Sequence, residues 1–141
     1  MNAFLLTILS IFTFFTFEQN SGSLTLTIQN IPEQRGVVRI LLFNQAAGFP
    51  DDVEKSYKQA NVKATGKSVQ VVFEGLPKGQ YALSVFHDVM ETGKLRTNAL
   101  GIPKDGYGFS NNANGSFGPP SFSKASFSVT TGKNQHQISL R

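Results

Sequence analysis

Short stretches in which apolar and polar residues alternate dominate the chain after residue 20. The first runs from Leu24 to Gln29, and the same period of two recurs at 69–73, 81–87, 125–129 and 138–140. Such alternation predicts β-strands with one buried face. Residues typical of turns, above all glycine, proline and asparagine, separate the stretches. The pattern therefore predicts an all-β fold, an antiparallel β-sandwich of about seven strands.

The stretch 37–43 differs because it is apolar on both faces. A strand of this kind is expected at the centre of a sheet, or under a cover on its outer side. The segment that follows places Asp51 before Glu54, which resembles a capping box, and puts Val53, Tyr57 and Ala60 at helical spacing. We therefore predict one short helix over about 52–59, positioned to supply that cover.

The run GLPKGQYALSVF at 75–86 combines a turn containing Pro77 and Gly79 with a tyrosine that starts an alternating strand. This spacing predicts a tyrosine corner, in which the Tyr81 ring is buried and its hydroxyl bonds back to the turn. The run resembles the L-P-x-G-x-Y start of a strand in transthyretin-like and carboxypeptidase-regulatory-like modules. The resemblance implies a transthyretin-like or immunoglobulin-like sandwich.

The N-terminus is a separate segment. Residues 3–17 carry no charge, and the polar run that begins at Glu18 ends them. The stretch is short for a bilayer span. Residues 1–20 are therefore predicted to be a signal peptide, with an uncleaved anchor as the alternative, which leaves 21–141 as a single domain without a transmembrane span. We expect export to the periplasm, the cell surface or the medium.

Composition excludes several classes of chemistry. The chain has no cysteine, so disulfides, thiolate catalysis and cysteine-ligated metals are excluded. The net charge is +4, but the lysines are spaced singly along the sequence. Electrostatic binding to phosphates needs several cations on one face, so nucleic acid is not an expected partner.

The longest segment without alternation, 88–122, is unlike an ordinary linker. Aromatic residues are interleaved there with glycine, proline and asparagine. This composition favours a long ordered loop that folds back on the domain and carries function. Because phenylalanine is usually buried, we expect Phe109, Phe117 and Phe122 to form a small core under this loop.

The pair His87-Asp88 closes the strand that precedes the loop. In one interpretation His87 bridges the sandwich to the loop by hydrogen bonds, while Asp88 accepts backbone N–H groups and starts a turn. In the other, both residues act with Asp105 in a metal-dependent or hydrolytic site. Gly93 fits the sixth position of an EF-type calcium loop counted from Asp88, but Met90 and Arg96 stand where oxygen ligands are required. We predict no metal, no cofactor and no catalytic residue.

Tyr107 lies close in sequence to three asparagines, and the group offers an aromatic face and side-chain amides. Sugars and peptides need such contacts, so the predicted ligand-binding residues are His87, Asp88, Tyr107, Asn111, Asn112 and Asn114. The leading hypothesis is an exported non-catalytic module that binds a protein, an envelope component or a glycan through the loop. The alternatives are an enzyme centred on His87, Asp88 and Asp105, and a purely structural envelope protein.

The segment HDVMETGKLRTNALGIPKDGYGFSNNANGSFGPPSFSKASF at 87–127 closely resembles an exported bacterial family, domain of unknown function 2141. Members typically read H-D-x-N-x-N-G-K-L-D-T-N and then G-I-P-x-x-G-Y-G-F-S-N. Met90, Thr92 and Arg96 depart from that pattern. The resemblance implies the sandwich fold and export, and no particular activity.

Overall fold

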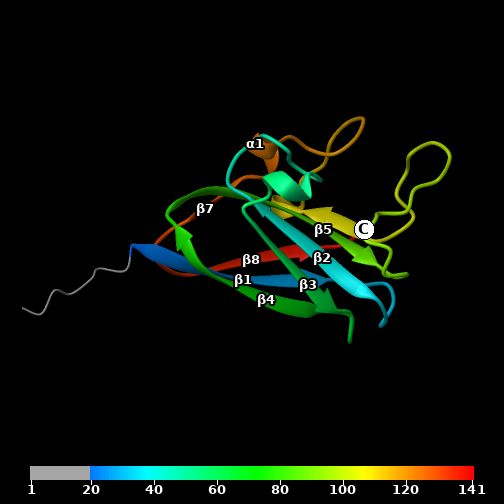
Figure 1. The fold of residues 1–141 in the computed structure, drawn as a ribbon, viewed down its shortest axis with the longest axis horizontal. Coiled ribbons are helices and arrows are strands. Elements are labelled where there is room, and N and C mark those ends of the chain that lie inside the picture. Colours follow the sequence, from blue (N-terminus) through cyan, green and yellow to red (C-terminus); the bar gives the residue numbers. More distant parts are fainter. Residues whose placement is uncertain (1–19) are drawn as a thin grey trace, which may run out of the picture.

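The computed structural model describes residues 20–141, so the predicted signal peptide lies almost entirely outside the described residues (Figure 1). Eight strands form two sheets, which confirms the predicted β-sandwich. The strands are β1 (Ser21–Gln29), β2 (Val37–Phe43), β3 (Lys58–Lys63), β4 (Val69–Pro77), β5 (Gly79–Asp88), β6 (Tyr107–Phe109), β7 (Phe127–Val129) and β8 (Gly132–Ser139). No helix in this part of the chain is long and apolar enough to cross a membrane.

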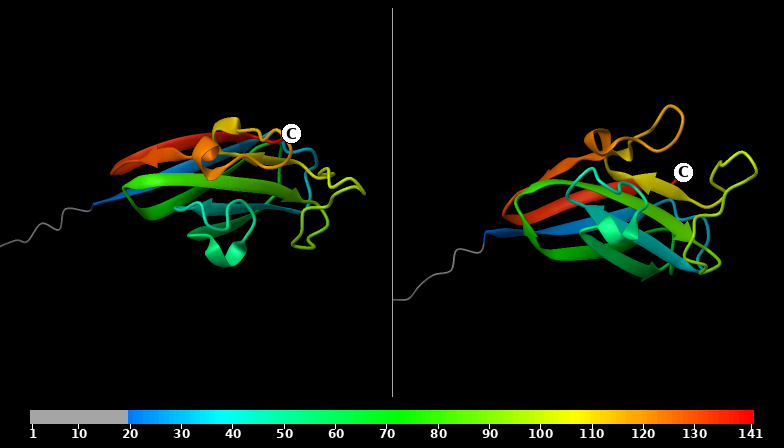
Figure 2. Two further views of the ribbon diagram at one scale, coloured as in Figure 1. Left: turned by 90° about the horizontal axis from the view of Figure 1, so that it is seen from above. Right: turned by 45° about the horizontal axis from the view of Figure 1, so that its top comes forward.

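The two sheets have different strand orders. The first is β4-β1-β8, and the second is β3-β2-β5-β6 with β7 paired to another part of β5. Every pairing is antiparallel except that of β1 with β8, which is parallel. Figure 2 shows the two layers and the loops that extend beyond them.

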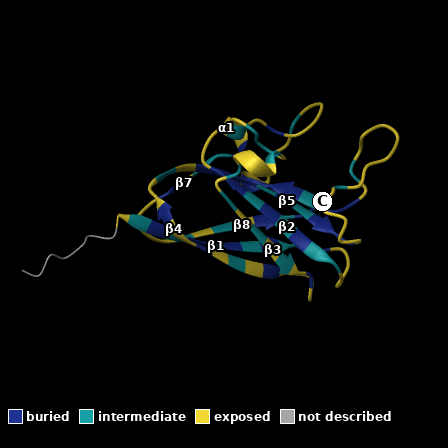
Figure 3. Ribbon diagram, in the orientation of Figure 1, coloured by how far each residue is buried: buried dark blue, intermediate teal, exposed yellow. Residues whose placement is uncertain are grey.

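The core lies between the sheets and follows the predicted alternation. Leu24, Leu26 and Ile28 of β1 are fully buried, and the intervening residues are only partly buried. On β5, Tyr81, Leu83 and Val85 face the same core. The Tyr81 hydroxyl donates a 2.6 Å hydrogen bond to the carbonyl of Pro77, so the tyrosine corner is confirmed. Figure 3 shows burial concentrated in the strands and exposure in the loops.

The predicted helix over 52–59 is wrong. The structure has one 3₁₀ turn, η1 (Val53–Lys55), capped by the carboxylate of Asp52, and then strand β3. One helical turn buries no residue here, whereas β3 gains a full ladder of backbone hydrogen bonds to β2. The only α-helical turn in residues 20–141 is α1 (Phe122–Ala125), at the far end of the long loop.

The expectation for the stretch 37–43 is confirmed in its main point. Strand β2 lies between β3 and β5, and the Phe43 end of its outer face is covered by the segment that carries η1. In that segment the Phe49 ring lies edge-on to Phe43, with centroids 5.4 Å apart, and the Pro50 carbonyl accepts a 2.5 Å hydrogen bond from Ser84. The cover is thus an irregular segment rather than a helix.

Candidate functional site

His87 lies at the end of β5 on the inner face of the sheet and is fully buried. Its Nε2 lies 2.7 Å from the carbonyl oxygen of Arg35, in the turn before β2. A carbonyl only accepts, so Nε2 carries the hydrogen. Nδ1 has no hydrogen-bond partner among residues 20–141. The sequence predicted that His87 bridges the sandwich to the long loop, but its side chain bonds instead to the turn between β1 and β2.

Asp88 points to the opposite face and closes the turn that starts the loop. Its carboxylate accepts hydrogen bonds from the backbone N–H groups of Thr92 (3.0 Å) and Gly93 (2.7 Å), and from Nε of Arg39 (2.6 Å). Burial alone would raise the pKa of Asp88, but these donors, Arg39 above all, outweigh it and lower that pKa. The predicted role as a backbone acceptor is confirmed.

Asp105, whose carboxylate is also buried, forms a second ion pair within the same segment. Arg96 donates to it through its backbone N–H (3.0 Å) and through its guanidinium, whose Nε lies 3.0 Å from Oδ1. The hydrogen bond from Arg96 lowers the pKa of Asp105 against the opposing effect of burial, and the same contact raises the pKa of Arg96. Arg96, where the family pattern has an aspartate, is therefore the counterion of a buried acid.

The three residues of the enzyme hypothesis thus have separate partners. His87 bonds to a backbone carbonyl, whereas Asp88 and Asp105 each pair with their own arginine. Among residues 20–141 no group of three histidine, aspartate or glutamate side chains is placed to hold a metal ion. The enzyme hypothesis itself stays a prediction.

The predicted contact residues around Tyr107 are largely engaged within the domain. The Tyr107 ring is half-buried beside Phe109, and the Arg141 guanidinium lies 5.2 Å from its centroid. Asn111 donates from its side-chain amide to the carbonyl of Ser126 (2.8 Å). These residues, as ligand contacts, remain predictions.

Two of the three asparagines near Tyr107 form hydrogen bonds within the domain, and the third is exposed without one among residues 20–141. Asn112 accepts from the backbone N–H of Ser139 (2.9 Å). Asn111 and Asn112 both have positive φ, 60° and 46°, in the turn η2 (Ser110–Asn112), a conformation that asparagine tolerates better than most residues. Asn114 is exposed and makes no hydrogen bond within residues 20–141. It is the asparagine of this group whose amide remains free for a ligand.

His136 belongs to the same region, although no pattern in the sequence placed it there. Its Nε2 accepts a 3.0 Å hydrogen bond from the backbone N–H of Asn111, and its ring stacks on Phe127 with centroids 4.2 Å apart. Burial lowers the pKa of His136. The histidine fixes the turn that begins the second part of the loop.

The small core under the loop exists, but its membership differs from the prediction. Phe109 and Phe122 pack with Phe49 and Ala125 on the outer face of the second sheet. Phe117 does not join them: its side chain is fully exposed, and this part of the prediction is wrong. The chain around it is a narrow turn, because a Cβ on Gly115 would lie 2.1 Å from the carbonyl oxygen of Gly118.

The segment exposes other large apolar side chains. Leu100 is 84% exposed, Ile102 55% and Met90 56%. Asn98 shapes the turn that carries the first two, since its side-chain oxygen accepts from the N–H groups of Leu100 (2.9 Å) and Ile102 (3.0 Å). We call Leu100, Ile102 and Phe117 the apolar tips. Leu100 and Ile102 lie in the loop segment that the sequence singled out, but no sequence pattern indicated their exposure.

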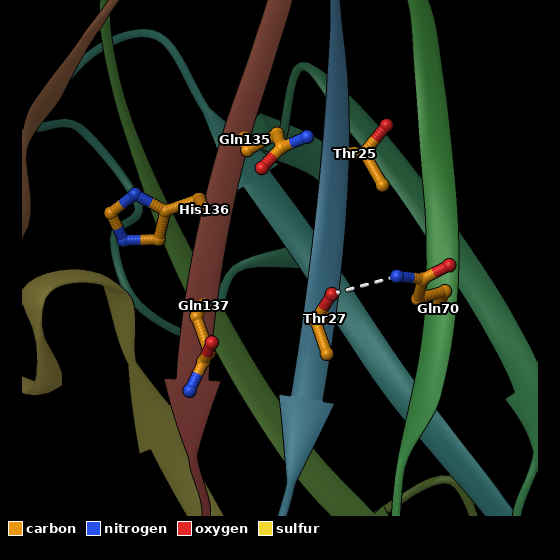
Figure 4. A pocket seen from close by; sticks show the side chains of 6 residues that line it. All are labelled: Thr25, Thr27, Gln70, Gln135, His136 and Gln137. Atoms are coloured by element: carbon orange, nitrogen blue, oxygen red, sulfur yellow. Dashed lines mark hydrogen bonds between the residues drawn. The ribbon is translucent and has the colours of Figure 1, made fainter.

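The other sheet presents a different kind of surface. A shallow hollow of about 200 Å³ lies over β1, β4 and β8 (Figure 4). Figure 4 shows the hydroxyl and amide side chains around it, with a 3.0 Å hydrogen bond from Gln70 to Thr27. The lining residues are Thr25, Thr27, Gln70, Gln135, His136 and Gln137. Hydroxyls and amides on an open face are typical of a solvated sheet surface.

Comparison with known proteins agrees with the resemblance noted in the sequence. No curated protein and no solved structure matches the chain. One family model matches residues 26–137, and it describes an uncharacterized protein conserved in bacteria, DUF2141. The match covers β2 to β7 and the whole loop segment, and it begins within β1 and ends within β8. The chain belongs to the DUF2141 family.

Proposed function

We propose that this domain is an exported, non-catalytic module that binds a partner in the cell envelope through the loops between residues 88 and 122. One observation carries the proposal. Of the seven large apolar side chains that are exposed in residues 20–141, four lie in this segment: Met90, Leu100, Ile102 and Phe117. Single exposed apolar residues are ordinary, whereas their concentration on one segment is typical of an interaction surface.

The way the first loop is held supports the same conclusion. The loop from 89 to 106 is tied to the sandwich through Asp88 and Arg39 at its start, and closed on itself through Arg96 and Asp105 near its end. Charge-assisted hydrogen bonds to buried carboxylates hold the loop backbone in one geometry, so the apolar side chains beyond them stay exposed at the surface. A loop fixed in this way loses little conformational entropy when it binds.

The contacts of the titratable residues favour binding over catalysis. Asp88, Asp105 and Nε2 of His87 bond to partners within the domain, and Nδ1 of His87 is buried away from the surface. A general acid or base must instead lie within hydrogen-bond reach of a substrate. Export is supported by the uncharged run at 3–17, which has the character of a signal peptide.

Affinity capture from the native cell envelope tests the proposal. The triple variant Leu100→Ser, Ile102→Ser, Phe117→Ser is compared with the control Val53→Ser, Val72→Ser, which removes apolar side chains that are 46% and 50% exposed elsewhere on the domain. We expect the triple variant to lose envelope components that the wild-type chain and the control retain. Equal capture by all three, with unchanged melting temperatures, contradicts the proposal and favours a purely structural protein.

The predicted amide contacts need a separate variant. Asn114→Ala leaves the internal hydrogen bonds of Asn111 and Asn112 in place. If the partner is a glycan or peptide held by amides, Asn114→Ala weakens capture even when the apolar tips are intact. Unchanged capture by this variant removes Asn114 from the contact surface.

A further inference from the structure

We propose that the partner of the apolar tips is the surface of an anionic phospholipid bilayer. This inference rests on the proposed function, because it names the partner that the loops between 88 and 122 contact. Apolar side chains enter the boundary between headgroups and acyl chains, and nearby cations meet the anionic headgroups. Both kinds of group are present at the loops.

The apolar tips project from the domain on two separate loops. Leu100 and Ile102 lie on the first loop, in the turn shaped by Asn98 and closed by a bridge between Thr97 and Pro103. Phe117 lies on the second loop, residues 113–121, which leads into α1. Figure 1 and the right-hand view of Figure 2 show both loops reaching past the strands, the second loop at the top and the first at the upper right. A flat surface is therefore able to meet them together.

Within residues 88–124 the exposed charges are mostly positive. Lys94 and Lys104 are exposed at the base of the first loop, and Lys124 is exposed on α1 beside the second. The charge of Arg96 is already matched by Asp105, and Glu91 is the exposed carboxylate of this segment. Basic residues near an anionic leaflet contribute to binding individually, so three exposed lysines suffice for an appreciable attraction.

A bilayer fits these tips better than the other partners do. Glycan recognition needs aromatic faces or hydrogen-bonding groups, and Leu100 and Ile102 offer neither in their side chains. A folded protein would have to provide one pocket for each projecting loop at a fixed separation. The boundary region of a bilayer accepts apolar side chains at any spacing, and its headgroup charge is complementary to the lysines.

Fluorescence of single tryptophans tests the contact directly. The chain contains no tryptophan, so Leu100→Trp and Phe117→Trp each provide a unique reporter in the full-length protein. Val72→Trp is the matched control, because Val72 is 50% exposed on β4, away from the loops. The probes are vesicles of phosphatidylcholine alone or mixed with phosphatidylglycerol, with or without brominated acyl chains.

With phosphatidylglycerol present, we expect the emission of the Leu100→Trp and Phe117→Trp variants to shift to the blue and to be quenched by the brominated chains. The Val72→Trp variant should show neither change. Each reporter responds to its own surroundings, so the result does not depend on what residues 1–19 contribute. Equal quenching of all three variants overturns the inference. Equal quenching of the loop variants with and without phosphatidylglycerol overturns it too.

Substitution of the lysines tests the charge. In the Phe117→Trp background, Lys94→Gln and Lys104→Gln should each weaken binding to phosphatidylglycerol vesicles by roughly fivefold. Lys133→Gln, at an exposed position on β8, is the control and should leave binding unchanged. Equal effects of all three overturn the proposed orientation on the membrane.

The two proposals fail in distinguishable ways. If no loop reporter responds to vesicles but envelope capture still requires the apolar tips, the partner is a protein and only the membrane inference is overturned. If capture is also independent of the tips, the proposed function is overturned with it.

Discussion

The two loops that carry the apolar tips are held in place by different means. The first, residues 89–106, is fixed by buried charge: Asp88 pairs with Arg39, and Asp105 with Arg96. The second, residues 113–121, has no ion pair, and no hydrogen bond involves residues 114–120 within the described part of the chain. It is shaped by the close approach of Gly115 to Gly118 and anchored by Phe122. Two loops that both expose apolar side chains are therefore held differently: the first by ion pairs and the second by close backbone contact.

This difference predicts that the loops respond to different perturbations. Carboxylate pairs are sensitive to acid and to the loss of one partner, because the remaining charge is then buried alone. A turn built on close backbone contact is sensitive to any added side-chain atom. Each loop can thus be loosened separately while the other keeps its geometry.

The largest expected effect is that of Asp88→Ala on the first loop. The substitution leaves Arg39 without its carboxylate and the N–H groups of Thr92 and Gly93 without an acceptor. Since Arg39 keeps some contact with solvent, we expect a loss of about 2–3 kcal/mol in the free energy of unfolding, measured by urea denaturation. The control Asp51→Ala removes an exposed carboxylate and should change stability by less than about 0.5 kcal/mol.

Hydrogen exchange in the Asp88→Ala variant then sharpens the comparison. Protection of backbone amides should fall in the first loop and stay unchanged at Ala113 and Ala125, which flank the second. A uniform loss of protection across both loops would show that they are one cooperative unit rather than two.

Acid should loosen the first loop only below about pH 4. The pKa values of Asp88 and Asp105 are both lowered in the folded protein. Their stabilising contribution is therefore complete above the unfolded carboxyl pKa of about 3.9, and is lost as the pH falls through the folded values below it. We expect the NMR amide shifts of Thr92, Gly93 and Arg96 to be constant from pH 7 to about pH 5. If these amide shifts titrate with midpoints above about pH 4, the ion pairs do not lower the pKa values of Asp88 and Asp105.

The sandwich could be predicted from the sequence because the patterns that indicate its strands lie within short stretches of the chain. Alternation on β1 and β5 predicted their buried faces, and the spacing from Pro77 to Tyr81 predicted a hydrogen bond that the structure contains. The helix over 52–59 failed since the apolar spacing of Val53, Tyr57 and Ala60 also suits a 3₁₀ turn followed by a strand. Pairing with β2 favours the strand over the helix, and β2 is too distant in sequence for the spacing within 52–60 to reveal that pairing.

The site was predictable only in part, because most of its contacts join distant residues. The sequence indicated that Asp88 starts a turn, since aspartate commonly accepts N–H groups just ahead of it. No local pattern indicates that Arg39 reaches Asp88 from β2, or that His136 on β8 holds Asn111. Phe117 was misplaced because burial preference describes phenylalanine on average, whereas the contact of Gly115 with Gly118 is specific to this turn.

Gly115→Ala should disturb the second loop alone. The added Cβ would lie 2.1 Å from the carbonyl oxygen of Gly118, so the backbone must shift. Because the turn is exposed and can open, we expect a cost of about 1 kcal/mol, the low end for overpacking. Gly66→Ala is the control, since its Cβ would meet only an ordinary contact of 3.8 Å. We expect NMR shift changes confined to residues 113–121. Changes that reach Thr92 or Gly93 would show that the second loop supports the first.

The smallest effect is expected from mild acid, and it should reach the second loop first. Burial lowers the pKa of His136, so its neutral form stabilises the fold fully above about pH 6.5, and this contribution declines as the pH falls toward the folded value. Protonation places a hydrogen on Nε2, which then no longer accepts from the N–H of Asn111. Because the ring is partly solvated, we expect a loss well under about 1 kcal/mol between pH 7.5 and pH 5.5. Thermal unfolding should show a decrease of about 1–3 °C for the wild-type chain. His136→Gln keeps a hydrogen-bond acceptor that does not titrate, so the melting temperature of this variant should fall less. An equal fall in the variant and the wild-type chain would mean that another group causes the pH response.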